Sequence, residues 1–226
     1  VIPTPWFPKP PFQISNYIEA WIKYPFLTYF KNTILVVVAA TMGNVMSSSI
    51  TAFGFARIRF PGRDFLFVIL ISTMMLPYQV KIIPLFQMYK TIGWLNSLWP
   101  LIVPAFFAAA SPFFVFLMRQ FFISIPEELA DAARIDGCGF VNIYLRIFLP
   151  LTKPAMVTVA LFSFMDNWND FFMPLIYINS NQFKTLSLGL AGMTGQYVSD
   201  WHIIMAASVI TVLPCVIIFL LAQRHF

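Results

Sequence analysis

Charged side chains are scarce in this chain. Only 10% of its 226 residues are Asp, Glu, Lys or Arg, whereas a soluble domain carries about 25%. Cysteine is scarce as well, and the sequence contains only Cys138 and Cys215. One lies in a polar stretch and the other in an apolar run, so we expect neither a disulfide between them nor a metal site.

Apolar residues take the place of the missing charge. The chain is 59% hydrophobic and 18% aromatic, with 26 phenylalanines. A water-soluble core of this size has too little interior to hide that much apolar surface. The composition therefore predicts an all-α membrane protein, built as a polytopic bundle of transmembrane helices.

Five charge-poor runs approach or exceed the roughly 20 residues needed to cross a bilayer. Pro77 is expected to bend the outer end of the second run, and residues 81–89 are expected to form a short surface helix. Five spans leave the two ends on opposite sides, which would place Val1 outside the cell membrane without a visible signal peptide. We therefore also expect a sixth span before Val1. The expected spans are Thr33–Ala56, Phe65–Val80, Trp99–Met118, Ala155–Tyr177 and Ile203–Leu221.

The basic residues predict the orientation. Arg57, Arg59 and Arg63 crowd into one short loop, and such loops lie on the cytoplasmic side. The C-terminus is then cytoplasmic, and residues 1–28, 81–96 and 178–201 are extracytoplasmic. Residues 179–200, within the last of these segments, are expected to form a polar loop. The proline-rich residues 1–12 are expected to be extended. No basic face is concentrated enough for a nucleic-acid partner.

A polar segment, residues 119–155, separates the third and fourth runs. Ser124 and Glu127 have the spacing of a capping box, so a helix is predicted from about Ile125 to Gly137, where glycine can adopt the left-handed conformation. A second short helix over residues 140–147 is predicted to stop before Pro150. The pattern fits an ordinary solvated loop, or a surface on which another protein docks; Ala130, Ala132 and Ala133 would leave the first helix smooth enough for close docking.

Polar residues also interrupt the fourth run. Asp166 and Asp170 are four residues apart and share a helix face. Charged groups within a bilayer usually face protein or a watery cavity, so this face lines a solute path or meets headgroups and partner helices near the outer end. Asn167, Trp168 and Asn169 belong to the same candidate path; Trp168 could stack on a sugar ring or anchor the helix at the interface.

The segment over residues 131–150 resembles the cytoplasmic EAA loop of ABC-transporter permeases, whose pattern is E-A-A-x3-G-x9-I-x-L-P. Every spacing agrees, while Asp131 replaces the usual glutamate and Cys138 stands where alanine is common. The resemblance implies that residues 126–148, here called the coupling segment, insert into an ATP-hydrolysing subunit. The implied coupling residues are Glu128, Asp131, Ala132, Ala133, Asp136, Gly137, Ile147, Leu149 and Pro150.

The resemblance covers nearly the whole chain. Residues 32–33, 57–62, 76–77, 168–169 and 174–176 look like those of carbohydrate-uptake permeases of the maltose and glycerol-phosphate type. It implies a single permease domain over residues 1–226 in the cytoplasmic membrane of a prokaryote. The implied partners are membrane lipid, a second homologous permease, two ATP-binding cassette subunits and an extracytoplasmic binding protein that delivers a sugar or related small polar solute.

The chain has no Gly-x-x-x-x-Gly-Lys-Ser/Thr phosphate-binding loop. We therefore expect no enzyme and no bound cofactor, with ATP and magnesium confined to the partner subunits. Two alternatives stay open: an intramembrane aspartyl enzyme that uses Asp166 and Asp170, and a scaffold without transport. Carboxylates four residues apart on one helix are poorly placed to share a proton, which weakens the first alternative.

Overall fold

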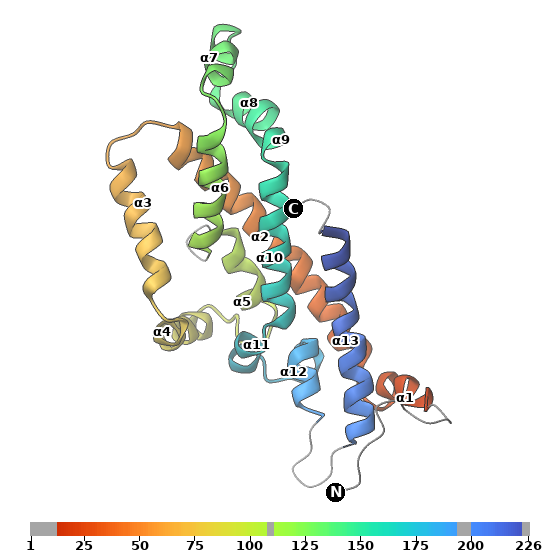
Figure 1. Ribbon diagram of the computed structural model, residues 1–226. Coiled ribbons are helices and arrows are strands. Elements are labelled where there is room, and N and C mark those ends of the chain that lie inside the picture. The colour runs from red at the N-terminus through yellow and green to blue at the C-terminus, as the bar shows by residue number, and fades with distance from the viewer. Residues whose placement is uncertain (1–12, 108–110, 194–199, 223–226) are drawn as a thin grey trace, which may run out of the picture.

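The computed structural model describes residues 13–107, 111–193 and 200–222, and every regular element within them is helical (Figure 1). The prediction of an all-α bundle of apolar helices is confirmed at this level. The helices in chain order are α1 (Ser15–Lys23), α2 (Phe26–Arg57), α3 (Arg63–Ser72), η1 (Thr73–Met75), α4 (Tyr78–Thr91), α5 (Trp99–Ile102), η2 (Val103–Phe106), α6 (Pro112–Ser124), α7 (Glu128–Ile135), α8 (Phe140–Ile143), η4 (Tyr144–Phe148), α9 (Leu149–Leu151), α10 (Lys153–Asn169), α11 (Phe172–Tyr177), η5 (Asn181–Phe183), α12 (Leu186–Ala191) and α13 (Trp201–Ala222).

Helix α2 is the central helix of the bundle. Its 32 residues extend about 48 Å at about 1.5 Å per residue, and it packs most extensively against α6 and α10. Small buried residues, among them Gly43, Ser48 and Ala52, let neighbouring helices approach closely. A continuous helix over the expected first span is confirmed, although it begins earlier, at Phe26.

The second expected span ends early. Its helix stops at Met75, and after Leu76 and Pro77 the chain turns by 99° into α4. Leu76 is extended (φ −79°, ψ 113°), as steric contact with a following proline demands. The predicted bend at Pro77 and the helix over residues 81–89 are confirmed, but the span does not continue to Val80.

The third and fourth expected spans are broken. Within residues 99–118, α5 and η2 end at Phe106 and α6 starts only at Pro112, because Pro104 and Pro112 have no N–H to continue a helical ladder. Within residues 155–177, α10 ends at Asn169 and Asp170 is extended (ψ 116°) before α11 begins. Each of these two expected spans is thus made of separate helical pieces.

Two single helices among the described residues are long and apolar enough to cross a membrane, Phe26–Arg57 and Trp201–Leu221. The second confirms a helix over the expected final span. If each sharply bent helix pair is one crossing, the number rises to four. The expected number of five is thus not established by helix length alone.

The bundle has two ends of different character (Figure 1). Helix α7 projects from one end, and α1 and α12 lie at the other. Residues 179–200, expected to be a polar loop, include η5 and α12; Leu186 of α12 is buried, and its amide donates to Thr33 Oγ1 at 2.8 Å. This expectation was wrong for α12, because tertiary contact with α2 stabilises a helix there. The proline-rich residues 1–12 lie outside the described part.

Candidate functional site

The projecting loop begins differently from the capping-box prediction. Ser124 is the last residue of α6, and its hydroxyl donates to the Phe121 carbonyl at 2.8 Å. Ile125 is extended (ψ 132°), because Pro126 follows it, so α7 begins only at Glu128. The predicted capping box is therefore wrong, as is a helix start near Ile125.

The end of α7 confirms the predicted glycine turn. Gly137 has φ +84°, its amide donates to the Arg134 carbonyl at 3.0 Å, and the Cys138 amide donates to the Ala133 carbonyl at 2.9 Å. These two bonds form a Schellman motif, which terminates a helix by reversing the chain at a left-handed residue. The chain then leaves α7 in one defined direction.

The second short helix does not stop before Pro150. Helix α8 runs into the π-helical turn η4, and α9 carries Pro150 in its first turn before the chain breaks at Thr152. In a regular α-helix, the Pro150 ring would meet the Arg146 carbonyl, and the wider π turn accommodates it. The helical segment Phe140–Leu151 then bends by 76° into α10.

The loop buries the alanines that were expected to form a docking face. Ala130 and Ala133 lie in the same core as Ile143 and Phe148, so the expectation is wrong for those two alanines. Small side chains at these positions let α7 pack closely, which is an internal role. Of the remaining coupling residues, Ile147 and Leu149 are half-buried, and the exposed ones are Glu128, Asp131, Ala132, Asp136, Gly137 and Pro150.

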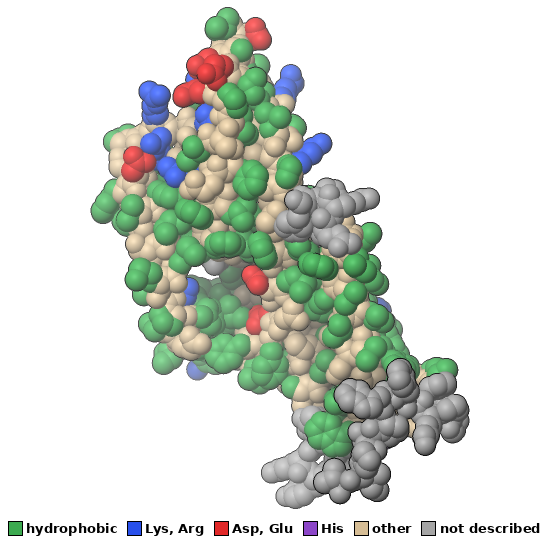
Figure 2. Space-filling model, in the orientation of Figure 1, with side chains coloured by type: hydrophobic (Ala, Val, Ile, Leu, Met, Phe, Trp, Pro, Cys, Tyr) green, Lys and Arg blue, Asp and Glu red, His purple; other side chains and the backbone are tan. Residues whose placement is uncertain are grey.

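Larger apolar side chains are exposed instead, and sequence reasoning missed them. Ile135 is 87% exposed, Val141 70% and Phe140 52%. Arg134 and Asp131 form an ion pair at 2.5 Å beside them, and Figure 2 shows acidic and basic side chains around the apolar tip. An exposed apolar patch with a charged rim marks a site of protein contact. The signal was present in the sequence as large apolar residues directly flanking the glycine turn.

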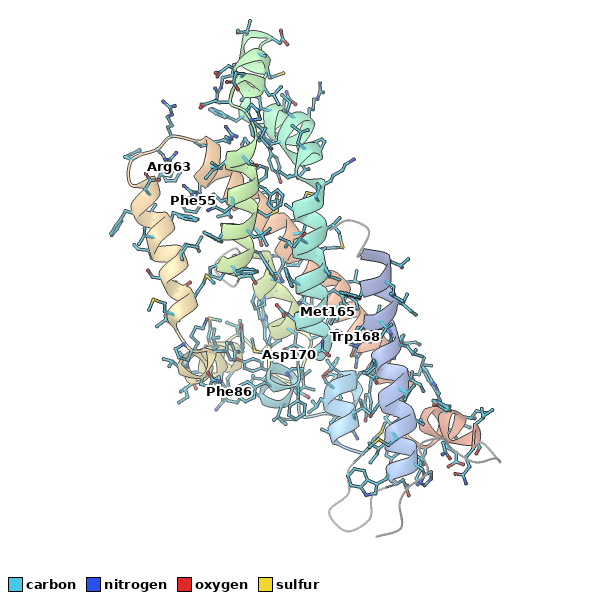
Figure 3. All side chains as sticks on the ribbon, viewed as in Figure 1. Phe55, Arg63, Phe86, Met165, Trp168 and Asp170 are labelled. Atoms are coloured by element: carbon cyan, nitrogen blue, oxygen red, sulfur yellow. The ribbon has the colours of Figure 1, made fainter. Side chains whose placement is uncertain are left out.

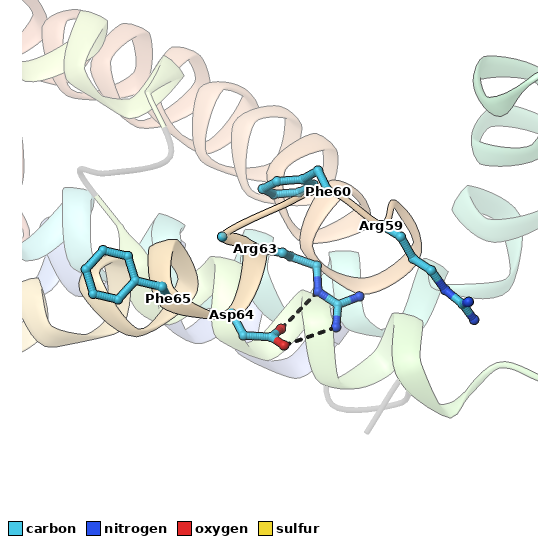
Figure 4. Close-up of a pocket in the computed structure, with 6 residues that line it drawn as sticks. Arg59, Phe60, Arg63, Asp64 and Phe65 are labelled. Atoms are coloured by element: carbon cyan, nitrogen blue, oxygen red, sulfur yellow. Dashed lines mark hydrogen bonds and ion pairs between the residues drawn. The ribbon is translucent and has the colours of Figure 1, made fainter.

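A separate hollow of about 340 Å³ lies at the turn between α2 and α3 (Figure 4). Arg63 and Asp64, adjacent in sequence, form an exposed ion pair there at 2.9 Å, and the Arg63 hydrogen bond lowers the pKa of the Asp64 carboxyl. Gly62 reverses the chain with φ +79°. These neighbours in sequence build a surface turn, and we assign no solute to it.

A cavity of about 560 Å³ opens between α2, α4, α5 and α10. Figure 2 shows acidic side chains beside a hollow midway along an otherwise apolar face. The described lining contains no Lys, Arg or His. Its polar members are Asn44, Tyr78, Ser111, Asp166, Asn167 and Asp170.

Amide and hydroxyl groups hold the wall of this cavity together. Asn44 Nδ2 donates to Ser163 Oγ at 2.8 Å, and Ser111 Oγ donates to Asn44 Oδ1 at 3.1 Å. Asn167 Nδ2 donates to the Ser163 carbonyl at 2.7 Å. The network ties α2 to α10 and to the start of α6, since buried polar groups must find partners.

The five candidate path residues separate into two groups. Asp166, Asn167 and Asp170 line the cavity, whereas Trp168 is 2% exposed and its Nε1 donates to the Thr211 carbonyl of α13 at 3.1 Å (Figure 3). Asn169 Nδ2 donates to the Met165 carbonyl at 2.8 Å and is not part of the lining. Trp168 therefore neither lines this cavity nor anchors at an interface, because the opposite face of α10 packs against α13.

Asp170 has a structural task at the break after α10. Its Oδ1 accepts the amides of Phe172 and Met173 at 3.1 and 3.2 Å, which satisfies donors at the start of α11. This use of Asp170 argues against a carboxylate pair that shares a proton with Asp166. Among the described residues no group of His, Cys, Asp and Glu has the makings of a metal site.

Comparison with known proteins agrees with this architecture. Residues 43–226 match the family described as "Binding-protein-dependent transport system inner membrane component". The whole chain is 32% identical over 225 residues to the probable ABC transporter permease YurM of Bacillus subtilis and covers 72% of it. It is 35% identical over 199 residues, 88% of this chain and 70% of the relative, to AraQ of Halalkalibacterium halodurans, an arabinooligosaccharide transport permease.

A solved structure shares the fold. A chain of a bacterial ABC transporter that imports the acidic polysaccharide alginate superposes with a TM-score of 0.85 at 24% identity, over 95% of this chain and 80% of that one. The match of the family to most of the chain, together with the identity to YurM and AraQ, decides the assignment. This chain belongs to the inner-membrane components of binding-protein-dependent transport systems, the membrane permeases of ABC importers.

Proposed function

We propose that this permease imports a sugar or a related small polar solute. It would receive the solute from an extracytoplasmic binding protein and work beside a second related permease and two ATP-binding cassette subunits, which would hold ATP and magnesium. Relatives named for arabinooligosaccharides, diacetylchitobiose and sn-glycerol 3-phosphate support this class of solute. The proposal excludes catalysis by this chain itself.

The proposed contact with the ATPase subunits is the coupling segment. The exposed apolar tip of Ile135, Phe140 and Val141 supports the proposal, because burying it in a cleft of another protein would remove it from water. The rim residues Glu128, Asp131 and Asp136 would set the orientation. Ala133, Ile147 and Leu149 would act from within, by shaping the segment, and Pro150 would shape its end from the surface.

The proposed solute path includes the cavity beside α10. Asp166 and Asn167 offer acceptors and donors to hydroxyl groups, and Tyr78 and Phe172 offer aromatic faces on the same wall. Sites that bind small polar molecules combine an apolar wall with a few polar groups. Trp168 and Asn169 are not part of this proposal.

The proposed topology has five crossings, with α7 in the cytoplasm and α1 outside. The arginines that contact the loop, Arg57, Arg59 and Arg134, support this orientation. Helix α13 runs from the α12 end toward the α7 end (Figure 1), which agrees with a cytoplasmic C-terminus. Residues 1–28, 81–96 and 178–201 would then be extracytoplasmic.

The observation that carries the proposal is a rigid helical loop with an exposed apolar tip, at one end of an apolar bundle of this family. The test is reconstitution of the complete importer in lipid vesicles with a binding protein from the same organism. We expect ATP hydrolysis to rise when the binding protein carries its sugar, and the sugar to accumulate. Hydrolysis that never responds to a loaded binding protein would contradict the proposal.

A further inference from the structure

Arg57, the last residue of α2, reaches into the base of the projecting loop. Its Nε donates to the Phe122 carbonyl at 3.1 Å, and its Nη2 donates to the carbonyls of Phe122 and Ile125. The guanidinium also lies over the ring of Phe148, 4.6 Å from the ring centroid. One side chain thus contacts the end of α6, the link to α7, and η4.

These contacts suit a guanidinium. The last carbonyls of a helix lack partners in the helix and mark the negative end of its dipole, so the end of α6 attracts a cation. The planar fork of Arg57 reaches two carbonyls at once while its face covers an aromatic ring. A lysine would bring the charge without this geometry.

An aromatic cluster, most of it buried, lies beside the arginine. The Phe53 ring of α2 lies 5.8 Å from Phe122, 5.1 Å from Tyr144 and 5.4 Å from Phe148, between ring centroids. Ser49 Oγ and the Tyr144 hydroxyl are 2.9 Å apart. Closely packed rings from α2, α6 and η4 resist sliding past one another. The π turn matters here because it carries both Tyr144 and Phe148.

The polypeptide itself joins the coupling segment to the spans through two bends. One is the extended link at Ile125, and the other is the 76° break at Thr152. A chain that bends at both attachments transmits rotation poorly unless other contacts fix the angle. Arg57 contacts Phe122 before the first bend, Ile125 at that bend, and Phe148 shortly before the second.

We infer that Arg57 is a positioning residue that locks the coupling segment to α2, so that movement of the segment in the ATPase subunit rotates α2 and the cavity wall. This inference rests on the proposed function. According to this inference, one charged side chain on the first spanning helix fixes the angle between the coupling segment and the spanning helices. In this inference Arg57 acts through the coupling segment and not by binding solute or ATP.

Arg119 is a matched control. It lies on α6, its Nε donates to the Phe55 carbonyl at 3.4 Å, and its guanidinium lies 4.2 Å from the centroid of the Phe67 ring. Arg119 thus makes the same two kinds of contact as Arg57, a hydrogen bond to a backbone carbonyl and a cation–π contact with a phenylalanine ring. Among the described residues, however, these partners belong to α2 and α3 rather than to the coupling segment.

The experiment compares Arg57→Met, Arg57→Lys and Arg119→Met in the complete importer, embedded in nanodiscs with its ATPase partners and its binding protein. Assembly and basal ATP hydrolysis are measured first. The next measurements are the stimulation of hydrolysis by the sugar-loaded binding protein and the amount of sugar transported per ATP hydrolysed. We expect Arg57→Met to assemble and hydrolyse ATP at the basal rate but to lose stimulation by about tenfold or more, within the usual range of coupling free energies. Arg119→Met should keep normal stimulation.

Normal coupling in Arg57→Met, or an equal loss in Arg119→Met, would overturn the inference and leave the proposed function intact. If Arg57→Met fails to assemble, Arg57→Lys decides, since it keeps the charge without the fork. If Arg57→Lys assembles and shows reduced stimulation, the inference is supported. If Arg57→Lys shows the stimulation of the wild type, the inference is overturned. A wild-type complex that ignores every loaded binding protein would instead contradict the proposed function.

Discussion

The amide of Cys138 donates to the carbonyl of Ala133 at 2.9 Å across the end of α7. This bond closes only because Gly137 between them takes φ +84°, a conformation that costs other residues about 1–2 kcal/mol. The bond orients the whole second half of the coupling segment. It links a single sequence position to the direction in which the apolar tip is presented.

Gly137→Val should uncouple ATP hydrolysis from uptake while leaving the spans folded. No atom lies within 4 Å of a Cβ built on Gly137, so the strain is confined to the backbone, where a β-branched residue fits badly. The measurement is sugar uptake and ATPase activity in proteoliposomes. Gly139→Val is the control, because Gly139 is extended with φ −76° and has equal space; normal uptake by Gly137→Val would refute the prediction.

Ala133→Leu should destabilise the loop, and Ala132→Leu should not. Ala133 is buried in the core with Ile143 and Phe148, and an overpacked core position costs about 1–3 kcal/mol. Ala132 is exposed on the same helix. Limited proteolysis of the loop in detergent-purified protein would measure the difference, and equal resistance in both variants would show that Ala133 is not a packing residue.

Ile135→Ser should weaken retention of the ATPase subunits. The side chain is 87% exposed, and removing an apolar group that becomes fully buried at an interface costs about 1.5–3 kcal/mol. Ile83 of α4 is 80% exposed at a distance from the loop, so Ile83→Ser is its counterpart. Co-purification under increasing detergent washes measures retention; loss of the ATPase in both variants, or in neither, would count against a docking tip.

Gly189→Ala should push α12 away from α2. A Cβ on Gly189 would stand 2.2 Å from a ring carbon of Tyr29, whereas one on Gly192 would have its nearest neighbour at 3.4 Å. We expect a lower midpoint of thermal unfolding for Gly189→Ala, by the few degrees that about 1–3 kcal/mol produces, and little change for Gly192→Ala. Replacing Tyr29 by leucine as well should restore part of the loss, and a double variant no better than Gly189→Ala would contradict the proposed clash.

Asp166→Asn should slow uptake without altering assembly. Its carboxylate faces the cavity, while Asn169 on the same helix does not line it, so Asn169→Ala serves as the comparison. The change replaces a charge-assisted hydrogen bond to a solute hydroxyl, worth about 1.5–3 kcal/mol, by a neutral one of about 0.5–1.5 kcal/mol, so we expect a rate roughly fivefold lower or less. Radiolabelled sugar uptake at a fixed amount of reconstituted complex is the readout, and equal rates in both variants would remove Asp166 from the path.

Sequence alone determined what depends on neighbouring residues along the chain. The long apolar runs of α2 and α13 are helices because lipid offers the backbone no other partners. The bend at Pro77 follows from the geometry of proline, and the turn at Gly137 follows from the freedom of glycine. The resemblance to ABC-transporter permeases rested on the same kind of local information, the fixed spacing from Asp131 to Pro150.

Only the tertiary structure decided which face of each helix meets which neighbour. Asp166 lines a cavity, while Trp168, two residues on, packs against α13; Ala133 is buried, while Ala132 is exposed. In a membrane protein, lipid is as apolar as the packed interior, so the hydrophobic pattern carries little information on the direction a helix faces. Contacts between distant segments, such as Arg57 with Phe148, supply that direction.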